Sequence, residues 1–547
     1  MAASKLRIVA LGGLGEIGRN MLVFEYDGRL LVVDAGLMIP ENDMFGVDLV
    51  IPDLSYVLER AEQVVGVVVT HGHEDHTGAL PYLLERVHAP VYATRLTRGL
   101  IEVKLREAKI TDADLHTIDP QDVVLLEPFC VEFYRVSHSI PDGVGLAIST
   151  PVGLVVHSGD FKFDHSPVDG RPTDFARLAE LGARGVLLLL SDSTNAESRG
   201  YTPSEQALGE TLARSFAQAQ GRVIVATFAS NISRLQQVMD IAAQIGRRVA
   251  VVGRSMVTNV RLARELGYLH VDEDTLLSVE QLDQLPDREA VLICTGSQGE
   301  PTSALVRMGL GTFRSVSVRR GDTVIVSASP IPGNEEMVNR TLDNLCRLGA
   351  DVYYDEVLDV HVSGHASQEE QKMLINIIRP QFFVPIHGEY RHLVLHAKHA
   401  RSCGIPAERV FVLETGDFLE IDASGGEVVD RAGGDYVYVD GLGVGDVRDA
   451  VIDDRRHLSQ NGIILAVVAV DKYTNGLVGQ PQIVTRGFID EGEANGLLDR
   501  ARDEVARAVA EGGTRSEMQA RIDSSLRRFA RQETGRHPMV VPVVTRV

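Results

Sequence analysis

The sequence predicts an α/β protein of several domains, and the patterns of three regions carry that prediction. Up to residue 202, apolar runs such as RIVALGG, LLVVDAG and VVGVVVT end in glycine or a small polar residue, as buried strands do. From residue 203 onward, amphipathic segments alternate with strands such as RVIVATFA, which is typical of a doubly wound parallel sheet. Residues 461–547 fit two strands, two helices and a final strand. A chain of 547 residues accommodates about three or four such domains.

Composition and apolar run lengths indicate a cytoplasmic protein with no membrane association. The hydrophobic content of 44% is ordinary for a globular protein. The longest apolar runs, GVLLLL and IILAVVAV, are far shorter than the ~20 residues of a membrane span. The start, MAASKLRIVALGG, lacks the charged and apolar regions of a signal peptide. The 4 cysteines are far apart and form no CxxC, so neither a disulfide framework nor a thiolate zinc site is expected.

The net charge of −22 argues against nonspecific binding to nucleic acid, which normally needs a basic surface. It does not exclude a polyanionic substrate, because bound divalent cations and a locally basic groove can act against an unfavourable average charge. The net charge therefore leaves a nucleic-acid substrate open.

Some elements can be placed individually. A helix is expected at 77–87, where TGALPYLLERV follows a group of histidines. A second helix covers PSEQALGETLARSFAQA, with Ser204 as its expected N-cap. Ala207 stands where a capping box would have Glu or Gln, so this start signal is incomplete. Residues 424–434, SGGEVVDRAGG, fit a surface hairpin and turn.

Two glycine-rich segments resemble nucleotide-binding motifs but lack their context. Residues 13–18 match GxGxxG after a strand, with Asp34 at a later strand end. The motif requires a helix next, whereas NMLVFEYDGRLLVVDAG predicts a hairpin turning at Asp27-Gly28. CTGSQGEPTSAL lacks the Gly-Lys-Ser/Thr of a P-loop. Neither segment predicts a nucleotide site.

The segment THGHEDHTGALP at 70–81 carries the strongest chemical signal. His71 and His73 can converge, while Asp75 and His76 lie on the next turn and point elsewhere, so two neighbouring cations fit better than one. Imidazole and carboxylate ligands suit Zn²⁺ and also Mn²⁺. The alternative is a polar loop with chance histidines, but 17 His among 547 residues make such a cluster improbable. Glu74 is expected to face solvent.

A site for two metal ions needs further ligands, and three strand ends offer them. His138 lies in YRVSHSIPDG, Asp160 in VVHSGDFKF and His387 in FVPIHGEYRH, each directly after an apolar strand. One such residue alone would more often be structural. Together with the histidine cluster they predict a two-metal centre.

These motifs resemble the β-CASP branch of the metallo-β-lactamase superfamily. SDSTN at 191–195, SGH at 363–365 and PIHGE at 385–389 resemble the three motifs that this branch adds. GGLGEIGRN, DAGLMIPE, ATFASNISR and HVSGHAS extend the resemblance to the ribonuclease J family over nearly the whole chain. The resemblance implies an α/β fold, namely a metallo-β-lactamase αββα sandwich with an inserted doubly wound β-CASP domain and a small C-terminal α/β domain.

The resemblance also implies domain boundaries and ligand roles. The implied parts are the metallo-β-lactamase domain at 1–202 and 363–445, the β-CASP domain at 203–362, a linker at 446–460 and a C-terminal domain at 461–547. His71, His73 and His138 would hold one divalent ion, Asp75, His76 and His387 the other, and Asp160 would bridge them. Asp34 resembles an acid that orients a ligand histidine, although a strand-end turn aspartate would look the same.

Catalytic and substrate-binding residues follow from the same motifs. His365 is the candidate general acid, with Asp192 orienting it or the nucleophile; the alternative is that both are turn residues. The small polar segments 228–233 and 363–367 suit a terminal 5′-phosphate. The residues expected to bind substrate are Ser230, Asn231, His361, Val362, Ser363, Gly364, His365, Ala366 and Ser367. Phe45, Val47 and Asp440, near the acidic loop ENDMFGVD, are candidates for framing an additional structural divalent cation.

The expected function is therefore hydrolysis of single-stranded RNA, 5′ to 3′ from a 5′-monophosphate end, with endonuclease activity, in RNA decay and maturation. The alternatives are a DNA-processing nuclease of the same branch, a small-molecule hydrolase, and a non-catalytic RNA-binding scaffold. A small-molecule hydrolase would lack the insertion, and a scaffold would have lost ligands. The strands IILAVVAVD and MVVPVVTRV are too apolar to stay exposed on so small a C-terminal domain, so we expect a homodimer through this domain.

Overall fold

The computed structural model describes residues 5–41, 43–331, 333–431, 434–490 and 495–547. The chain divides into two compact units. One contains residues 1–39 and 49–437, and the other contains residues 40–48 and 438–547. The described helices include none with the length and apolarity that a bilayer span requires.

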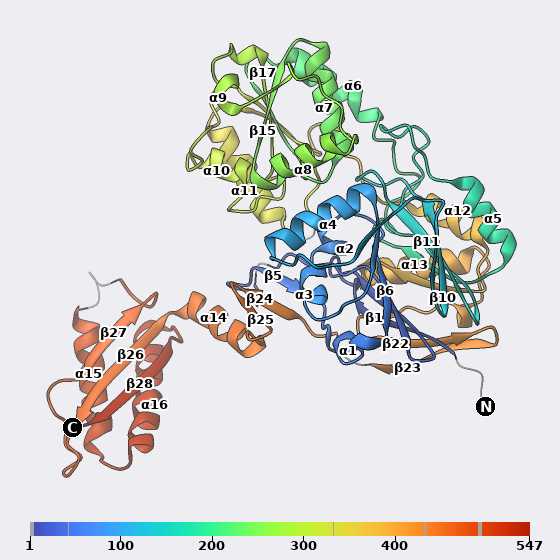
Figure 1. Cartoon of the computed structure of the whole chain (residues 1–547). Helices are drawn as coiled ribbons and strands as arrows, with labels where there is room; N and C mark the ends of the chain where they lie inside the picture. The colour runs from blue at the N-terminus through green and yellow to red at the C-terminus, as the bar shows by residue number, and fades with distance from the viewer. Residues whose placement is uncertain (1–4, 42, 332, 432–433, 491–494) are drawn as a thin grey trace. The chain divides into compact units, whose positions relative to one another are not determined.

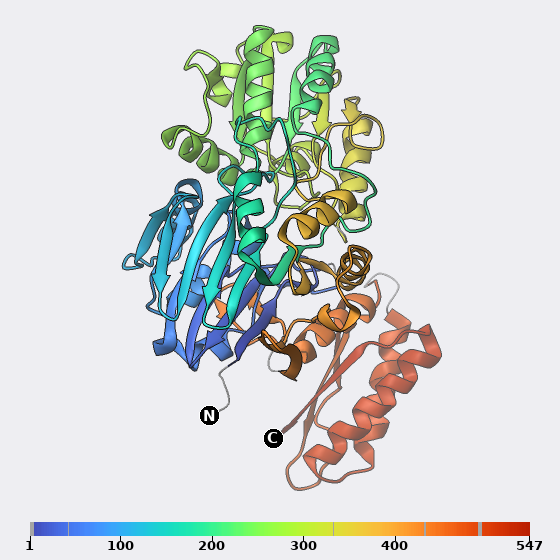
Figure 2. The same ribbon diagram turned by 90° about the vertical axis from the view of Figure 1, so that its right-hand side faces the viewer.

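The first unit is built around two sheets packed face to face (Figure 2). In spatial order, the first sheet contains β23 (Gly425–Arg431), β22 (Asp417–Asp422), β1 (Leu6–Gly12), β3 (Met21–Tyr26), β4 (Arg29–Val33), β6 (Val64–Val68), β7 (Val91–Thr94) and β8 (Leu115–Ile118). The second contains β20 (Phe382–Ile386), β13 (Val186–Asp192), β12 (Gly153–His157), β11 (Val144–Thr150), β10 (Phe129–Arg135) and β9 (Val123–Leu126). Leu31 and Val33 of the first sheet share one apolar cluster with Val131, Leu146 and Leu188 of the second. Burial of this interface is the main apolar contribution to the sandwich.

Helices complete the sandwich on its outer faces. Leu181, Ile375 and Ala397 from three different helices pack on Val156 and Phe383 of the second sheet. The helices of this part are α1 (Ser55–Leu58), α2 (Glu74–Thr77), α3 (Leu80–Leu84), α4 (Arg95–Glu107), α5 (Phe175–Arg184), α12 (Gln368–Ile378) and α13 (Tyr390–Ser402). Short strands β2 (Leu14–Gly15), β5 (Leu49–Ile51) and β21 (Gly388–Glu389), and 3-10 turns at Ala61–Gln63, Asp287–Glu289 and Ala407–Arg409, complete the first unit. The order of layers is helix, sheet, sheet, helix.

The inserted domain is a parallel sheet with helices on both faces (Figure 1). Its spatial order is β16 (Leu276–Leu277), β15 (Arg248–Val252), β17 (Ala290–Cys294), β14 (Val223–Ala226), β18 (Thr323–Val326) and β19 (Asp351–Tyr353). One face is covered by α6 (Ala207–Gln218), α7 (Ile232–Gln244) and α8 (Arg254–Glu265), and the other by α9 (Val279–Leu282), α10 (Ala304–Gly309) and α11 (Glu335–Arg347). The doubly wound prediction is confirmed. Leu96, Leu100 and Ile140 of the sandwich extend the core beneath α7 and α8.

The second unit contains the predicted C-terminal pattern. Its elements are β24 (Val437–Asp440), β25 (Gly443–Val444), α14 (Asp449–Asn461), β26 (Ile463–Val470), β27 (Gln482–Arg486), α15 (Asn495–Ala510), α16 (Arg515–Thr534) and β28 (Met539–Arg546). β26 lies between β27 and β28, and residues of α15 and α16 pack on Ile464 and Val468. The expected linker at 446–460 is mostly the helix α14.

Two local expectations were wrong. The helix expected at 77–87 is divided into α2 and α3, and it begins earlier, at Glu74. Ser204 does not cap α6, which begins at Ala207 after Gln206. The backbone N–H of Glu205 donates instead to the carboxylate of Asp164 at 3.0 Å, and this tertiary contact holds the segment in a turn. In the hairpin expected at 424–434, residues 425–431 form β23, whereas 432–433 lie outside the described residues.

Candidate metal centre

The sandwich brings all the predicted ligands to one edge. The segment containing His71 and His76 follows β6, and His138 follows β10. Asp160 follows β12 and His387 follows β20. Because these strands belong to two facing sheets, their ends supply side chains from both layers.

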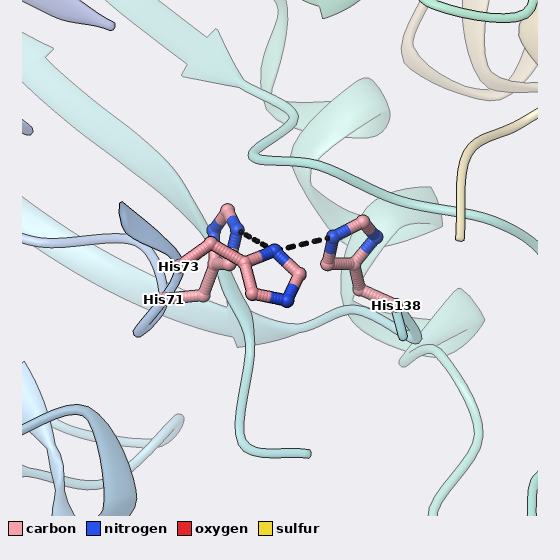
Figure 3. A group of neighbouring side chains, drawn as sticks. All are labelled: His71, His73 and His138. Carbon is pink, nitrogen blue, oxygen red and sulfur yellow. Dashed lines mark hydrogen bonds between the residues drawn. The ribbon is translucent and has the colours of Figure 1, made fainter. Parts of the chain in front are cut away.

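One group of ligand atoms consists of three histidine nitrogens (Figure 3). Nδ1 of His73 lies 3.0 Å from Nε2 of His71 and 3.1 Å from Nε2 of His138. Each neutral imidazole carries one proton. In His71 and His138 the other nitrogen, Nδ1, contacts Thr70 and Gly364, respectively. A cation between the three nitrogens would accept all three lone pairs, so the donor set fits a Zn²⁺-like ion.

A second group combines two carboxylates and two histidines. Nε2 of His387 lies 3.2 Å from Oδ2 of Asp75, and Nε2 of His76 lies 3.2 Å from Oδ2 of Asp160. All four ligand atoms of this group lie within 4.8 Å of one another. This mixed nitrogen and oxygen set suits Zn²⁺ or Mn²⁺.

Asp160 stands between the two groups. Its Oδ2 is 3.4 Å from Nε2 of His387 on one side. On the other side it is 3.7 Å from Nε2 of His71 and 3.9 Å from Nε2 of His138. A single carboxylate oxygen therefore faces ligands of both groups.

The outer nitrogens of the histidines are held by residues behind them. Nδ1 of His76 lies 2.8 Å from Oδ2 of Asp34, which also accepts a hydrogen bond from the hydroxyl of Thr70 at 2.9 Å. Nδ1 of His138 donates to the carbonyl oxygen of Gly364 at 2.7 Å. Nδ1 of His387 lies 2.6 Å from the hydroxyl oxygen of Thr194. Such contacts fix the ring orientation and leave Nε2 facing the centre, as metal ligands require.

Burial and neighbouring charges set the protonation of the ligands. Burial lowers the pKa of His71 and His138, and it lowers the pKa of His73 to about 4. These three rings are therefore neutral at neutral pH, the form that binds metal. Burial opposes charge on His387 as well, but the Asp160, Asp192 and Asp75 carboxylates outweigh it and raise its pKa to about 10.

Asp192 and His365 form a pair at the side of this centre. Oδ2 of Asp192 lies 2.8 Å from Nδ1 of His365, and its Oδ1 accepts hydrogen bonds from the N–H and hydroxyl of Thr194 at 2.9 Å each. Burial opposes ionisation of Asp192, but the contact with His365 outweighs it and holds the pKa of the carboxyl below its usual value. The His365 ring lies 4.8 Å from the ring of His138 and 5.2 Å from that of His387, between centroids. Its side chain is 18% exposed, whereas that of Asp192 is 1% exposed.

Several residues predicted to bind substrate make internal contacts. The side chain of Asn231 caps α7. Ser363 Oγ accepts a hydrogen bond from Asn195 at 2.8 Å, and Ser367 forms a capping box at the start of α12. Gly364 holds His138 through its carbonyl group. The remaining predicted residues of this segment, His361, Val362, His365 and Ala366, lie beside them, and Ser230 lies directly before the α7 cap.

His361 differs from its neighbours. Its Nδ1 is buried and has no hydrogen-bond partner among the residues that the structure describes. Burial lowers the pKa of this ring to about 4, with the Arg234 charge adding to the effect. In the tautomer that carries its proton on Nδ1, this neutral ring can donate a hydrogen bond to an oxygen of a ligand.

Asn20 contacts the candidate ligands, and the sequence did not predict this. Its Nδ2 donates to the backbone oxygen of Asp75 at 3.0 Å and lies 3.1 Å from Nε2 of His76. The carbonyl of Gly13 accepts a hydrogen bond from His387 N–H at 3.1 Å. Gly13 has a φ of +80°, and a Cβ there would lie 2.2 Å from the Asn20 side-chain oxygen. The glycine-rich segment is thus a wall of the metal centre, and the expected hairpin follows it as β3 and β4.

Two other expectations concern charge. Glu74 is exposed, as predicted, and pairs with Lys104. At the candidate structural cation site, Arg455 donates to the carbonyl oxygen of Phe45 at 3.0 Å and pairs with Asp440 at 2.5 Å. Near Val47, Arg455 is therefore a partner of Asp440 in this structure, and the structural cation stays a prediction.

Family models match consecutive parts of the chain. They are described as "Metallo-beta-lactamase superfamily" (residues 14–200), "Ribonuclease J, beta-CASP domain" (220–345), "Zn-dependent metallo-hydrolase RNA specificity domain" (350–412) and "Ribonuclease J C-terminal domain" (450–547). The last match includes all of α14 except its first residue, Asp449. Together with the observed sheets, these matches confirm the expected fold class.

Individual relatives match over their full length. Ribonuclease J2 of Bacillus subtilis (strain 168) is 42% identical, and the match covers 99% of this chain and 99% of that protein. Ribonuclease J of Thermus thermophilus is also 42% identical, with 98% of this chain and 95% of that protein covered. A solved structure of a protein of unknown function from Enterococcus faecalis V583 shares the fold, with a TM-score of 0.56 and 16% identity over 76% of this chain and 100% of that one.

Proposed function

The chain belongs to the ribonuclease J family, and from this premise we propose that it hydrolyses RNA 5′ to 3′ with two divalent ions. That it is a metal-dependent ribonuclease follows from the full-length relatives and the metallo-β-lactamase domain. The position of Asp160 between two ligand groups carries the proposal of two ions. His71, His73 and His138 would hold one ion, Asp75, His76 and His387 the other, with zinc preferred and manganese the alternative.

The residues around the ions divide the remaining work. When bound, two such ions would supply Lewis acidity to a water molecule and to the phosphodiester. Asp192 holds Nδ1 of His365, which leaves Nε2 to donate a proton. A hydroxide, formed when water gives up a proton to solvent, bonds through its oxygen to phosphorus. The bond to the 3′-oxygen breaks, that oxygen takes the proton from Nε2 of His365, and solvent returns a proton to His365. His365 thus acts as general acid and Asp192 orients it.

We further propose that a terminal 5′-monophosphate is bound by Ser230, Asn231 and residues 361–367. The open Nδ1 of His361 and the small side chains of this segment support such a pocket. A bound 5′ end would place the first phosphodiester at the metal centre, which gives exonuclease action. Internal cleavage needs only the centre and remains possible on RNA without a usable end. Such activity would serve RNA decay and maturation in the cytoplasm.

A homodimer through the C-terminal domain is supported by the open face of its sheet. Ile464, Ala466 and Val468 of β26 face the helices and are buried. Ile463, Leu465 and Val467 alternate with them and are only half-buried. An apolar sheet face of this kind is typical of a subunit interface. Each subunit would retain its own metal centre.

The decisive test is digestion of 5′-labelled single-stranded RNA with monophosphate, triphosphate or hydroxyl ends, with Mn²⁺, Mg²⁺ or Zn²⁺ added. We expect mononucleotide release to be fastest from the monophosphate end and a chelator to abolish it. Equal rates on all three ends would refute the proposed end preference. A matched DNA strand in the same assay tests the DNA-processing alternative, which predicts faster cleavage of DNA.

A further inference from the structure

The junction between the sandwich and the inserted domain contains a fully buried arginine that the proposed chemistry does not use. Arg234, in the first turn of α7, is 0% exposed. Its Nη2 donates to Oε2 of Glu205 at 2.7 Å, and its Nη1 donates to the carbonyl oxygen of Val360 at 2.8 Å and to the hydroxyl of Ser327. One guanidinium therefore joins segments that are far apart in the chain.

Two of these segments form the proposed phosphate pocket. The side chain of Asn231 accepts a hydrogen bond from the Arg234 N–H at 3.0 Å, which fixes the first turn of α7. The carbonyl of Val360 lies directly before His361, and it accepts a second hydrogen bond from Ser327 at 2.6 Å. The spacing between residues 230–231 and residues 361–367 is thus set by the reach of Arg234.

The same network continues to the metal centre. Glu205 receives the guanidinium, and its backbone N–H donates to Asp164 at 3.0 Å. The carboxylate of Asp164 lies 3.8 Å from the ammonium group of Lys162, which is also buried. The backbone N–H of Lys162 donates to the carbonyl of Ser137 at 2.8 Å, one residue before His138. Hydrogen bonds and ion pairs therefore connect the pocket to a predicted ligand.

The charges show that this arginine acts through geometry. Glu205 balances the Arg234 charge at contact distance, so the guanidinium adds little net attraction for a phosphate. The planar guanidinium has donors in fixed directions and can bind Glu205, Val360 and Ser327 at once. An ammonium group is a point charge without this fixed geometry. Buried polar atoms of His361 and Ser137 have no partner in the described part of the chain, which leaves donors and acceptors open beside the network.

We propose that Arg234 is a positioning residue that holds the two walls of the 5′-phosphate pocket in register with the metal centre. The proposal rests on the 5′-monophosphate preference proposed above. It predicts that loss of the guanidinium affects recognition of the RNA end more than cleavage itself.

The test compares Arg234→Met with Arg222→Met in the full chain. Arg222 offers a matched control because it is also buried in the inserted domain and pairs with Asp322 at 3.0 and 2.6 Å. Arg222 and Asp322 precede β14 and β18, whereas Arg234 and Ser327 lie beyond the opposite ends of the same strands. KM and kcat would be measured on RNA with a 5′-monophosphate and on the same RNA with a 5′-hydroxyl, alongside melting temperature and metal content.

We expect Arg234→Met to raise KM for the monophosphate substrate about tenfold or more, because charge-assisted hydrogen bonds that fix the pocket are lost. Its kcat, and its KM for the hydroxyl substrate, should stay within about twofold of the wild-type values, since the metal centre is retained. Both variants should lower the melting temperature by similar amounts, because each loses a buried ion pair. Arg222→Met should leave the ratio of the two KM values unchanged.

Ser327→Ala covers the case in which Arg234→Met does not fold, because it removes one partner and keeps the Arg234–Glu205 ion pair. We expect it to raise the monophosphate KM about threefold, as loss of one hydrogen bond would. The proposal is overturned if folded Arg234→Met or Ser327→Ala protein keeps the wild-type ratio of the KM values for the monophosphate and hydroxyl substrates. It is also overturned if Arg222→Met changes this ratio as much as Arg234→Met does. A wild-type chain that does not distinguish the two ends overturns the proposed end preference itself, and this inference with it.

Discussion

Asn20 and Arg234 contact residues that lie far away in the sequence, outside the motifs that predict the site. The grouping of the candidate ligands was predictable because HxHxDH and the strand-end residues indicate metal binding by residue type and spacing. Asn20 lies in a glycine-rich motif without that signal, and its partner Asp75 is 55 residues away. Arg234 and Val360 are 126 residues apart. Such roles are defined by tertiary contacts, which a local pattern does not contain.

For Asn20, removal of the amide should weaken the second group of ligands. We expect Asn20→Ala to lower metal affinity or activity by about 10–100-fold, the usual effect of losing a contact that orients ligands. Competition with a chelator and elemental analysis would measure the affinity. The exposed Asn376 on α12 provides a control, and Asn376→Ala should leave metal affinity unchanged. Wild-type affinity in Asn20→Ala would show that Asp75 and His76 are held without it.

For His365, chemistry and metal binding can be separated. We expect His365→Ala to retain both ions by elemental analysis and to slow cleavage by about 10²–10⁴-fold, the usual contribution of a general acid. The control is His116→Ala, because His116 is exposed on β8 and lies outside the ligand groups. This variant should cleave RNA at the wild-type rate. Loss of an ion from His365→Ala would instead make His365 a ligand.

For His76, the effect should be larger. His76→Ala removes a ligand of the proposed second ion, so we expect RNA hydrolysis to be nearly abolished while the melting temperature of the metal-free protein changes little. Atomic absorption on the purified variant would show the missing ion. Normal turnover by metal-replete His76→Ala protein is incompatible with two-metal catalysis.

At the scale of elements, strands were predicted more reliably than helix starts. Apolar runs bounded by glycine or small polar residues became β1, β4 and β6 because burial on a sheet follows directly from composition. The start of α6 was misplaced because the contact of Glu205 with Asp164, across the domain junction, overrides the local capping preference of Ser204. Element type follows from local pattern, whereas element ends respond to distant partners.

Ion pairs join helix α5 to strand β10, so the stability of the fold should depend on pH. Hydrogen bonds from Arg184, opposed by burial and assisted by Arg177, lower the pKa of Glu132. A lowered folded-state pKa stabilises the fold above the unfolded value of about 4.3. That stabilisation is lost as pH falls through the folded value. We expect the free energy of unfolding of the wild type to exceed that of Glu132→Gln by about 1 kcal/mol at pH 7, a small value because the arginines are partly exposed. This difference in free energy should shrink below about pH 4. Urea unfolding at both pH values would measure it, and an unchanged difference would contradict the assignment.

At the scale of the whole molecule, the assembly prediction can be tested without touching the catalytic unit. A chain truncated before Gly462 should be monomeric by light scattering, with its metal content intact and weaker activity on long RNA. Leu465→Glu should have the same effect on assembly, because this residue is on the open face of β26 while its neighbours Ile464 and Ala466 form the core. A truncated protein that remains dimeric would place the interface elsewhere.

The hydrogen bond between Asp192 and His365 joins residues that are 173 positions apart, with the inserted domain between them. His387 also follows the inserted domain in the sequence. The set of candidate ligands is therefore complete only after the inserted domain has been translated. A ribosome that has reached residue 202 would carry a chain with most of the ligands but neither His365 nor His387. We therefore expect a nascent chain to be inert toward the message that encodes it, with its activity switched on by the order of synthesis.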